Sequence, residues 1–211
     1  MIFHALSISV ANFVQNQKII LHMSFSLKTA MFTLVLALIT TLCKYFFGPE
    51  IALSGFSPVL AIALFSGFVF RRSEWVFFFS IVALLVSDIS IQLLYINDLF
   101  DYQGIYAGQW KNYLLLLSCT YMGFVFKAAS YRNIGLAAVF APTVFFFLSN
   151  GLVWLQAAEV VYTKDATGLF TCLIAGLPFY KNSLIATFIF LPATLVFFNY
   201  LSLRKLELRL S

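Results

Sequence analysis

Long apolar stretches, separated by short polar segments, divide most of the chain. Six stretches are free or nearly free of charged residues: 29–47, 51–70, 75–96, 112–126, 134–157 and 183–203. Most have the roughly 20 residues that a helix needs to cross a hydrocarbon core about 30 Å thick. The ten-residue alternation typical of a membrane β-barrel does not occur. The pattern therefore predicts an all-α integral membrane protein, a bundle of six transmembrane helices.

The composition agrees with this class. The hydrophobic fraction is 62%, the mean hydropathy is +0.96, and only 10% of the residues are charged. These values exclude an ordinary soluble globular domain. The lipid bilayer is thus the first partner that the sequence implies.

Basic residues set the expected orientation. With six spans and a cytoplasmic N-terminus, nine of the thirteen bases, including all the arginines, fall on the cytoplasmic side. The net charge of +5 then reflects topology. No nucleic-acid partner is expected, because the bases are dispersed among short loops. We predict a multi-pass protein of the bacterial inner (plasma) membrane with both termini in the cytoplasm.

The six-helix membrane domain is predicted to cover 29–203, followed by a basic cytoplasmic tail over 204–211. The segment 1–28 mixes apolar residues with Asn, Gln and Lys. It is either a cytoplasmic or interfacial segment or, in part, a stretch upstream of a true start at Met23. No Walker-type glycine–lysine motif occurs, so an ATPase would have to be a separate chain.

Asp88 is the only charged residue in the apolar run 75–96. A carboxylate there needs a partner, a proton or a water-filled cavity. On a helix, Asp88 and Gln92 fall on the same face. The helix pattern therefore predicts that this face points into the bundle.

Other polar residues point to the same region. Asn150 and Trp154 form a stripe on the fifth span, and Asn182 lies at the outer start of the sixth. With Asp88 and Gln92, they predict a substrate-binding pocket that opens outward and has aromatic walls. Two alternatives stay open: Asp88 and Asn150 only hydrogen-bond neighbouring helices, or they belong to a proton relay.

The segment 158–182 contains a second apolar run, 168–180, that is too short to cross the bilayer. Gly168, Gly176 and Pro178 are expected to break this run. The segment is then a candidate lid over the pocket, or else an amphipathic loop on the headgroups.

Small residues recur on the second span at spacings that permit close helix approach: Ser57, Ala61, Ala63 and Gly67. They indicate either internal packing or a partner face. The three cysteines lack metal-ligand spacing and are expected in the apolar core. No Ser/His pair, Asp/Asp pair or His-rich box occurs, so we expect no enzyme, no cofactor and no metal site.

Four segments resemble one bacterial family: GFSPVLAIALFSG (55–67), LVSD (85–88), SNGLVW (149–154) and GLFTCLIAGLPFYKN (168–182). That family is an uncharacterised set of proposed membrane transport proteins. It is similar to the substrate-binding S-components of energy-coupling factor (ECF) vitamin transporters, and the resemblance covers roughly residues 50–200. S-components typically carry an Ala-x-x-x-Ala docking motif on the first helix, whereas Ala30 and Ala37 are seven residues apart here.

The resemblance implies a transporter or S-component-like subunit for uptake of a small micronutrient, a vitamin-like molecule or a metal chelate. It would act alone or with a separate ATPase and a coupling membrane subunit. The ligand would be captured from outside, enclosed by 158–182 and released inward. The alternative is a non-transporting membrane assembly or scaffold subunit, in which the inward polar groups only fix the helix register.

Overall fold

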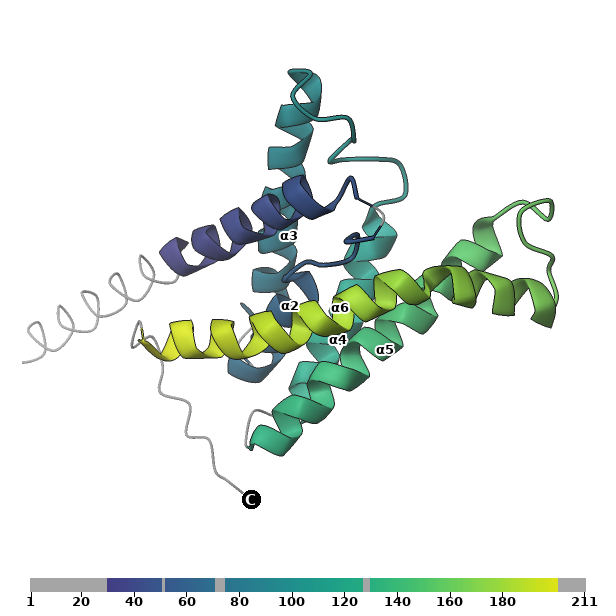
Figure 1. Cartoon of the computed structure of the whole chain (residues 1–211). Helices are drawn as coiled ribbons and strands as arrows, with labels where there is room; N and C mark the ends of the chain where they lie inside the picture. The colour runs from purple at the N-terminus through teal and green to yellow at the C-terminus, as the bar shows by residue number, and fades with distance from the viewer. Residues whose placement is uncertain (1–29, 51, 71–74, 127–129, 201–211) are drawn as a thin grey trace, which may run out of the picture.

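Every regular element that the structure describes is a helix (Figure 1). The computed structural model describes residues 30–50, 52–70, 75–126 and 130–200. Its helices are Ala30–Phe47, α2 (Val59–Val69), α3 (Trp75–Ile96), α4 (Trp110–Phe126), α5 (Tyr131–Gln156) and α6 (Ala166–Tyr200). The all-α class is confirmed, and the helix predicted over 75–96 has the predicted bounds.

By length and composition, four of these helices could cross a bilayer: Ala30–Phe47, Val76–Ile96, Tyr131–Gln156 and Ala166–Tyr200. Large apolar side chains lie on their outer surfaces, and Leu34, Phe170 and Val196 are each about two-thirds exposed. Exposed apolar surface on this scale is unusual in a soluble protein and suits helices that face lipid. The described chain is therefore that of a membrane-embedded protein. Six crossings stay a prediction.

The 11-residue helix α2 forms the centre of the molecule. All its residues from Leu60 to Val69 are buried, and it packs against α3, α4, α5 and α6. Aromatic rings close the contact with the other elements: the ring centroid of Phe65 lies 5.3 Å from that of Phe32 and 5.1 Å from that of Phe198. A helix that is apolar on all sides is stable only when it is enclosed in this way.

The span predicted over 51–70 is wrong in its first half, because α2 begins at Val59. The preceding residues form turns. Gly55 has a φ of +88°, a conformation outside the helical region that glycine adopts at little cost. Apolar composition alone did not separate this loop from the helix that follows it. At ~1.5 Å per residue, an 11-residue helix covers only about half of the hydrocarbon thickness.

Of the two roles considered for the small residues of the second span, the structure supports internal packing. Ala61 and Ala63 are fully buried. A Cβ added at Gly67 would lie 2.1 Å from the carbonyl oxygen of Thr120, and one at Gly123 would lie 2.3 Å from that of Leu64. The backbones of α2 and α4 thus touch, as small residues allow. This face is not available to a partner, although Ser57, in the loop before α2, is partly exposed.

Helix α6 runs without interruption from Ala166 to Tyr200, so the prediction that Gly168, Gly176 and Pro178 break the apolar run is wrong. Gly168 and Gly176 are buried at close contacts, where a Cβ would lie 2.0 Å from the Thr163 carbonyl oxygen and 2.4 Å from Asn150 Oδ1. Close packing, of Gly168 against the turn before α6 and of Gly176 against α5, therefore accompanies these helical glycines. The segment expected to act as a lid is therefore not separate from the predicted sixth span, because most of it belongs to the same helix, α6.

Helices α5 and α6 form a hairpin whose tip projects away from the other elements (Figure 1). In the same view, α3 and α4 run across this hairpin, and α4 contacts α5. The loop between α3 and α4, residues 97–109, follows the end of α3 and returns to the start of α4. Polar side chains gather at this end of the molecule.

Candidate functional site

Asp88 lies in a buried polar cluster between α3, the helix Ala30–Phe47 and the start of α4. Only 4% of its surface is exposed. It forms an ion pair through Oδ1 with Lys44 Nζ, which also donates a hydrogen bond to Ser87 Oγ at 2.8 Å. Gln109 Nε2 and Tyr113 Oη both donate to Asp88 Oδ2, the latter at 2.6 Å. The carboxylate is thus charge-compensated and hydrogen-bonded through both oxygens, as burial requires.

The same cluster holds the 97–109 loop on α3. Gln92 Oε1 accepts a hydrogen bond from the Ile105 backbone N–H at 2.9 Å, and Gln109 Nε2 donates to the Gly104 carbonyl at 3.0 Å. A Cβ at Gly104 would lie 2.1 Å from the Asp88 carbonyl oxygen. Asp88 and Gln92 therefore share a face, as predicted from the sequence, but in this structure their partners are protein groups.

Asn150 and Trp154, on α5, have their partners within the hairpin. Asn150 Nδ2 donates to the Phe146 carbonyl at 2.8 Å, and its side chain packs against Gly176 of α6. The indole Nε1 of Trp154 donates to the Thr163 carbonyl at 2.8 Å, in the turn between the two helices. These contacts secure the hairpin.

Asn182 has a third location. Its Nδ2 donates to the carbonyls of Ala52 and Ser54 at 2.8 and 2.9 Å, so it ties the loop before α2 to α6. The structure thus distributes the five predicted residues over three places: Asp88 with Gln92, Asn150 with Trp154, and Asn182 alone. A pocket that they form together stays a prediction.

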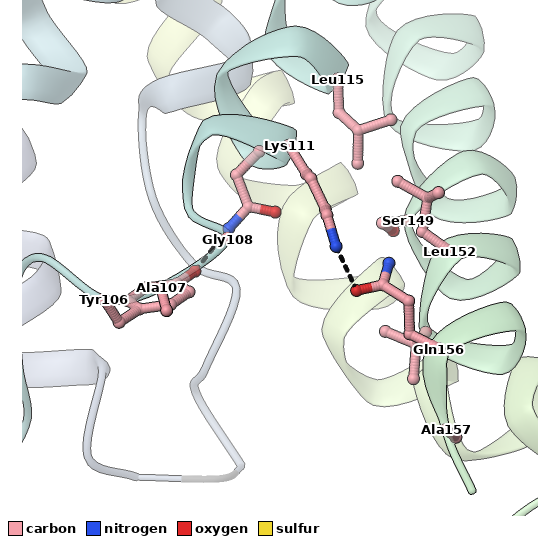
Figure 2. Close-up of a pocket in the computed structure, with 11 residues that line it drawn as sticks. Tyr106, Ala107, Gly108, Lys111, Leu115, Ser149, Leu152, Gln156 and Ala157 are labelled. Atoms are coloured by element: carbon pink, nitrogen blue, oxygen red, sulfur yellow. Dashed lines mark hydrogen bonds between the residues drawn. The ribbon is translucent and has the colours of Figure 1, made fainter.

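A cavity of about 530 Å³ lies between the start of α4 with its preceding loop and the last turns of α5 (Figure 2). Its lining comes from the two sides: Tyr106, Ala107, Gly108, Lys111, Asn112 and Leu115 on one, and Ser149, Leu152, Val153, Gln156 and Ala157 on the other. The volume is within the range of pockets that hold small organic ligands, about 300–1,000 Å³.

Polar side chains of the lining make two hydrogen bonds with one another. Lys111 reaches across the hollow from α4, and its Nζ donates to Gln156 Oε1 at 2.5 Å (Figure 2). At the rim, Asn112 Nδ2 donates to Tyr106 Oη at 2.5 Å. Burial, followed by the nearby Asp88 carboxylate, raises the pKa of Tyr106, and the hydrogen bond from Asn112 lowers it by less. The phenol is therefore protonated at neutral pH and can donate a hydrogen bond.

The cavity and the Asp88 cluster share a wall. Gln109, which donates to Asp88, also accepts a hydrogen bond from the Tyr106 backbone N–H through Oε1 at 3.2 Å. Tyr106 lines the cavity two residues beyond Gly104. The buried ion pair thus positions the loop that forms one side of the hollow.

A family model described as "Family of unknown function (DUF6580)" matches residues 23–208. The chain belongs to this family. No curated protein and no solved structure matches it. Because the family description gives no activity, any functional assignment for this DUF6580 member rests on the geometry of its sites.

Sequence reasoning missed the cavity of this DUF6580 protein. Ser149, Leu152, Val153 and Gln156 follow the i, i+3, i+4, i+7 pattern of one helix face, which was a detectable signal. Leu152 and Val153 on that face are apolar, however, as residues of a lipid-facing surface are. Only the approach of the 106–112 segment makes it the wall of a cavity.

The three cysteines are buried, as expected for the apolar core. Cys172 Sγ lies 3.4 Å from the Asn150 carbonyl oxygen, at the contact of α6 with α5. In the described ranges, no group of three His, Cys, Asp or Glu side chains is placed to hold a metal ion.

Proposed function

We propose that this membrane-embedded protein binds a small organic molecule in the cavity between the 106–112 segment and α5, and that it serves uptake of that molecule. The observation that carries the proposal is the cavity itself. Its volume of about 530 Å³ suits a ligand of vitamin size, and apolar walls surround a few convergent polar groups. This is the chemistry expected of a substrate-binding site in a helical carrier.

The resemblance to S-components of ECF transporters supports the same proposal. It supplies the expectation of a micronutrient ligand, captured from outside the cell. A separate ATPase and a coupling membrane subunit are proposed partners. The closing element proposed here is the 97–109 loop, because it already forms one cavity wall and is anchored on Asp88.

The competing function is a scaffold subunit that carries no ligand. The contacts of Asp88, Asn150 and Asn182 favour a scaffold, because each of these side chains hydrogen-bonds to a group of the protein itself. A scaffold, however, has no need of a cavity lined by a lysine. The two functions differ in whether a small molecule accompanies the purified protein.

A cavity-filling substitution tests the proposal. Leu152→Trp places an indole in the cavity, whereas Leu155→Trp, on the exposed side of the same helix, is the matched control. We expect gently solubilised wild-type protein and the Leu155→Trp variant to retain a small molecule detectable by mass spectrometry. Leu152→Trp should retain at least about tenfold less, a loss of about 1.4 kcal/mol of binding free energy.

Uptake of a panel of radiolabelled vitamins into cells that produce each variant should follow the same order. If both variants behave as wild type, or if wild-type protein carries no small molecule and supports no uptake, the proposal is wrong. Uptake by an Asn150→Ala variant tests the sequence-predicted site separately, because Asn150 faces α6 and does not line the cavity.

A further inference from the structure

The charge of Lys111 has neutral partners only. Its Nζ donates to the amide oxygen Oε1 of Gln156 and lies 5.8 Å from the ring centroid of Trp110. In the part of the chain that the structure describes, the one ion pair joins Lys44 to Asp88. The cavity therefore contains a positive charge without a carboxylate beside it.

The position of Lys111 in its helix is also unfavourable for a cation. It lies in the first turn of α4, where the partial positive charge of the helix dipole disfavours a second positive charge. No acidic residue in that turn offsets it. Helix stability therefore gives no reason for a lysine here.

A lysine at the edge of a membrane span often extends towards lipid headgroups. Lys111 instead points across the cavity to α5 (Figure 2). The apolar side chains of Leu115 and Leu152 line the same hollow. The ammonium group is thus presented to whatever fills the cavity.

We propose that the cavity binds an organic anion, whose carboxylate or phosphate group pairs with Lys111 Nζ while its apolar part lies against Leu115, Leu152 and Val153. The inference rests on the proposed function and specifies its class of ligand. Gln156 would release Lys111 and offer its amide Nε2 as a second donor to the same anion.

Pairs of probe molecules test whether the cavity prefers an anion; each pair consists of an acid and its uncharged analogue. The full-length protein is reconstituted in nanodiscs of phosphatidylcholine, which has no net charge, and binding is measured by equilibrium dialysis. The probes are biotin against biotinamide, pantothenate against panthenol, and nicotinate against nicotinamide. We expect at least one acid to bind about tenfold more tightly than its neutral partner, as a charge-assisted hydrogen bond provides.

The preference should be lost in Lys111→Gln and retained in Lys111→Arg, which keeps the charge. Equal binding of acid and neutral partner, or an acid preference that survives in Lys111→Gln, would overturn the anion class and leave the proposed function standing. If no probe binds, the small molecule that co-purifies with the protein, identified by mass spectrometry, tests the inference instead. An anion that is lost in Lys111→Gln supports the inference, a neutral molecule overturns it, and no molecule at all overturns both proposals.

A second set of nanodiscs, containing phosphatidylglycerol, distinguishes a soluble anion from a lipid headgroup. Competition between the acid probe and phosphatidylglycerol in wild-type protein, absent in Lys111→Gln, supports the anion site and shows that a headgroup can enter it. Binding of phosphatidylglycerol through Lys111 without binding of any soluble acid overturns the assignment to a transported solute.

Discussion

Two lysines near helix ends have opposite surroundings in this protein. Lys44 lies in the last turn of the helix Ala30–Phe47, where the helix dipole favours a cation, and it pairs with the buried carboxylate of Asp88. Lys111 lies in the first turn of α4, where the dipole disfavours a cation, and its partner is the neutral amide of Gln156. The first lysine completes a structural cluster, and the second has its charge available in a cavity.

Asp88 has a structural role in this protein. An isolated carboxylate in an apolar helix suggested a ligand site, but all the requirements of that carboxylate are met within the chain. Lys44 compensates its charge, and Gln109 and Tyr113 hydrogen-bond its second oxygen. A charge with a full set of partners stabilises the structure, whereas a charge with neutral partners at a hollow can still bind a ligand.

Removing Asp88 should have the largest effect. Asp88→Ala leaves Lys44 without its carboxylate, and the loss of one partner of a buried ion pair typically costs about 3–5 kcal/mol. We expect a decrease of this size in the free energy of unfolding, measured by denaturant titration in detergent micelles. The double variant Lys44→Met, Asp88→Leu should recover much of it, because no uncompensated charge is left.

Lys111→Gln is the matched control at the other lysine. Its unfolding free energy should stay within about 0.5 kcal/mol of the wild-type value, because Lys111 makes no ion pair in the described structure. A large loss of stability in this variant, or none in Asp88→Ala, would remove the distinction between the two sites.

Gly104→Ala tests whether the two regions are coupled. The added Cβ would lie 2.1 Å from the Asp88 carbonyl oxygen and 2.3 Å from the Gln92 backbone nitrogen, so the loop must move away from α3. We expect a loss of about 1–3 kcal/mol in stability, as for other overpacked sites, together with weaker ligand binding in the cavity.

Gly135→Ala provides the control for this glycine, because a Cβ there has open space and the residue lies inside α5. It should stabilise the protein by about 0.5–1 kcal/mol through helix propensity alone. Unchanged ligand binding in Gly104→Ala would mean that the Asp88 cluster does not position the cavity wall.

Removing the Asp165 side chain should have the smallest effect on stability, because this residue is fully exposed although it is hydrogen-bonded. The hydrogen bond from the Thr163 hydroxyl, followed by that from the Gly168 backbone N–H, lowers its pKa. A lowered folded-state pKa means that ionised Asp165 stabilises the protein above its unfolded pKa of about 3.9, and that this contribution is lost as the pH falls through the folded-state value.

Asp165→Ala should therefore lower the unfolding midpoint by no more than a few degrees at pH 7, and the difference from wild type should be smaller at pH 3, below the unfolded pKa. Thermal scans at both pH values measure it. A difference of the same size at both pH values would show that the carboxylate charge at the start of α6 is not its source.

Much of the fold followed from the apolar pattern. It placed α3 at the correct bounds and α4 and α5 to within three residues, because uncharged runs of that length in lipid favour helices. It failed at α2 and α6. Residues 52–58 carry no charge, as in a span, yet they form a loop with turns, and Gly176 stays helical where it lies directly against Asn150.

By itself, the sequence determined that this is a helical membrane protein with a buried carboxylate that needs partners, because hydrophobicity and the cost of an isolated charge are properties of the residues. The tertiary structure alone decided which groups meet that need. It brought Lys44 to Asp88 from a helix 44 residues away, and it brought Lys111 and Gln156, 45 residues apart, to opposite sides of a cavity. Contacts between distant segments depend on how the helices cross, and the apolar pattern of each helix does not specify that geometry.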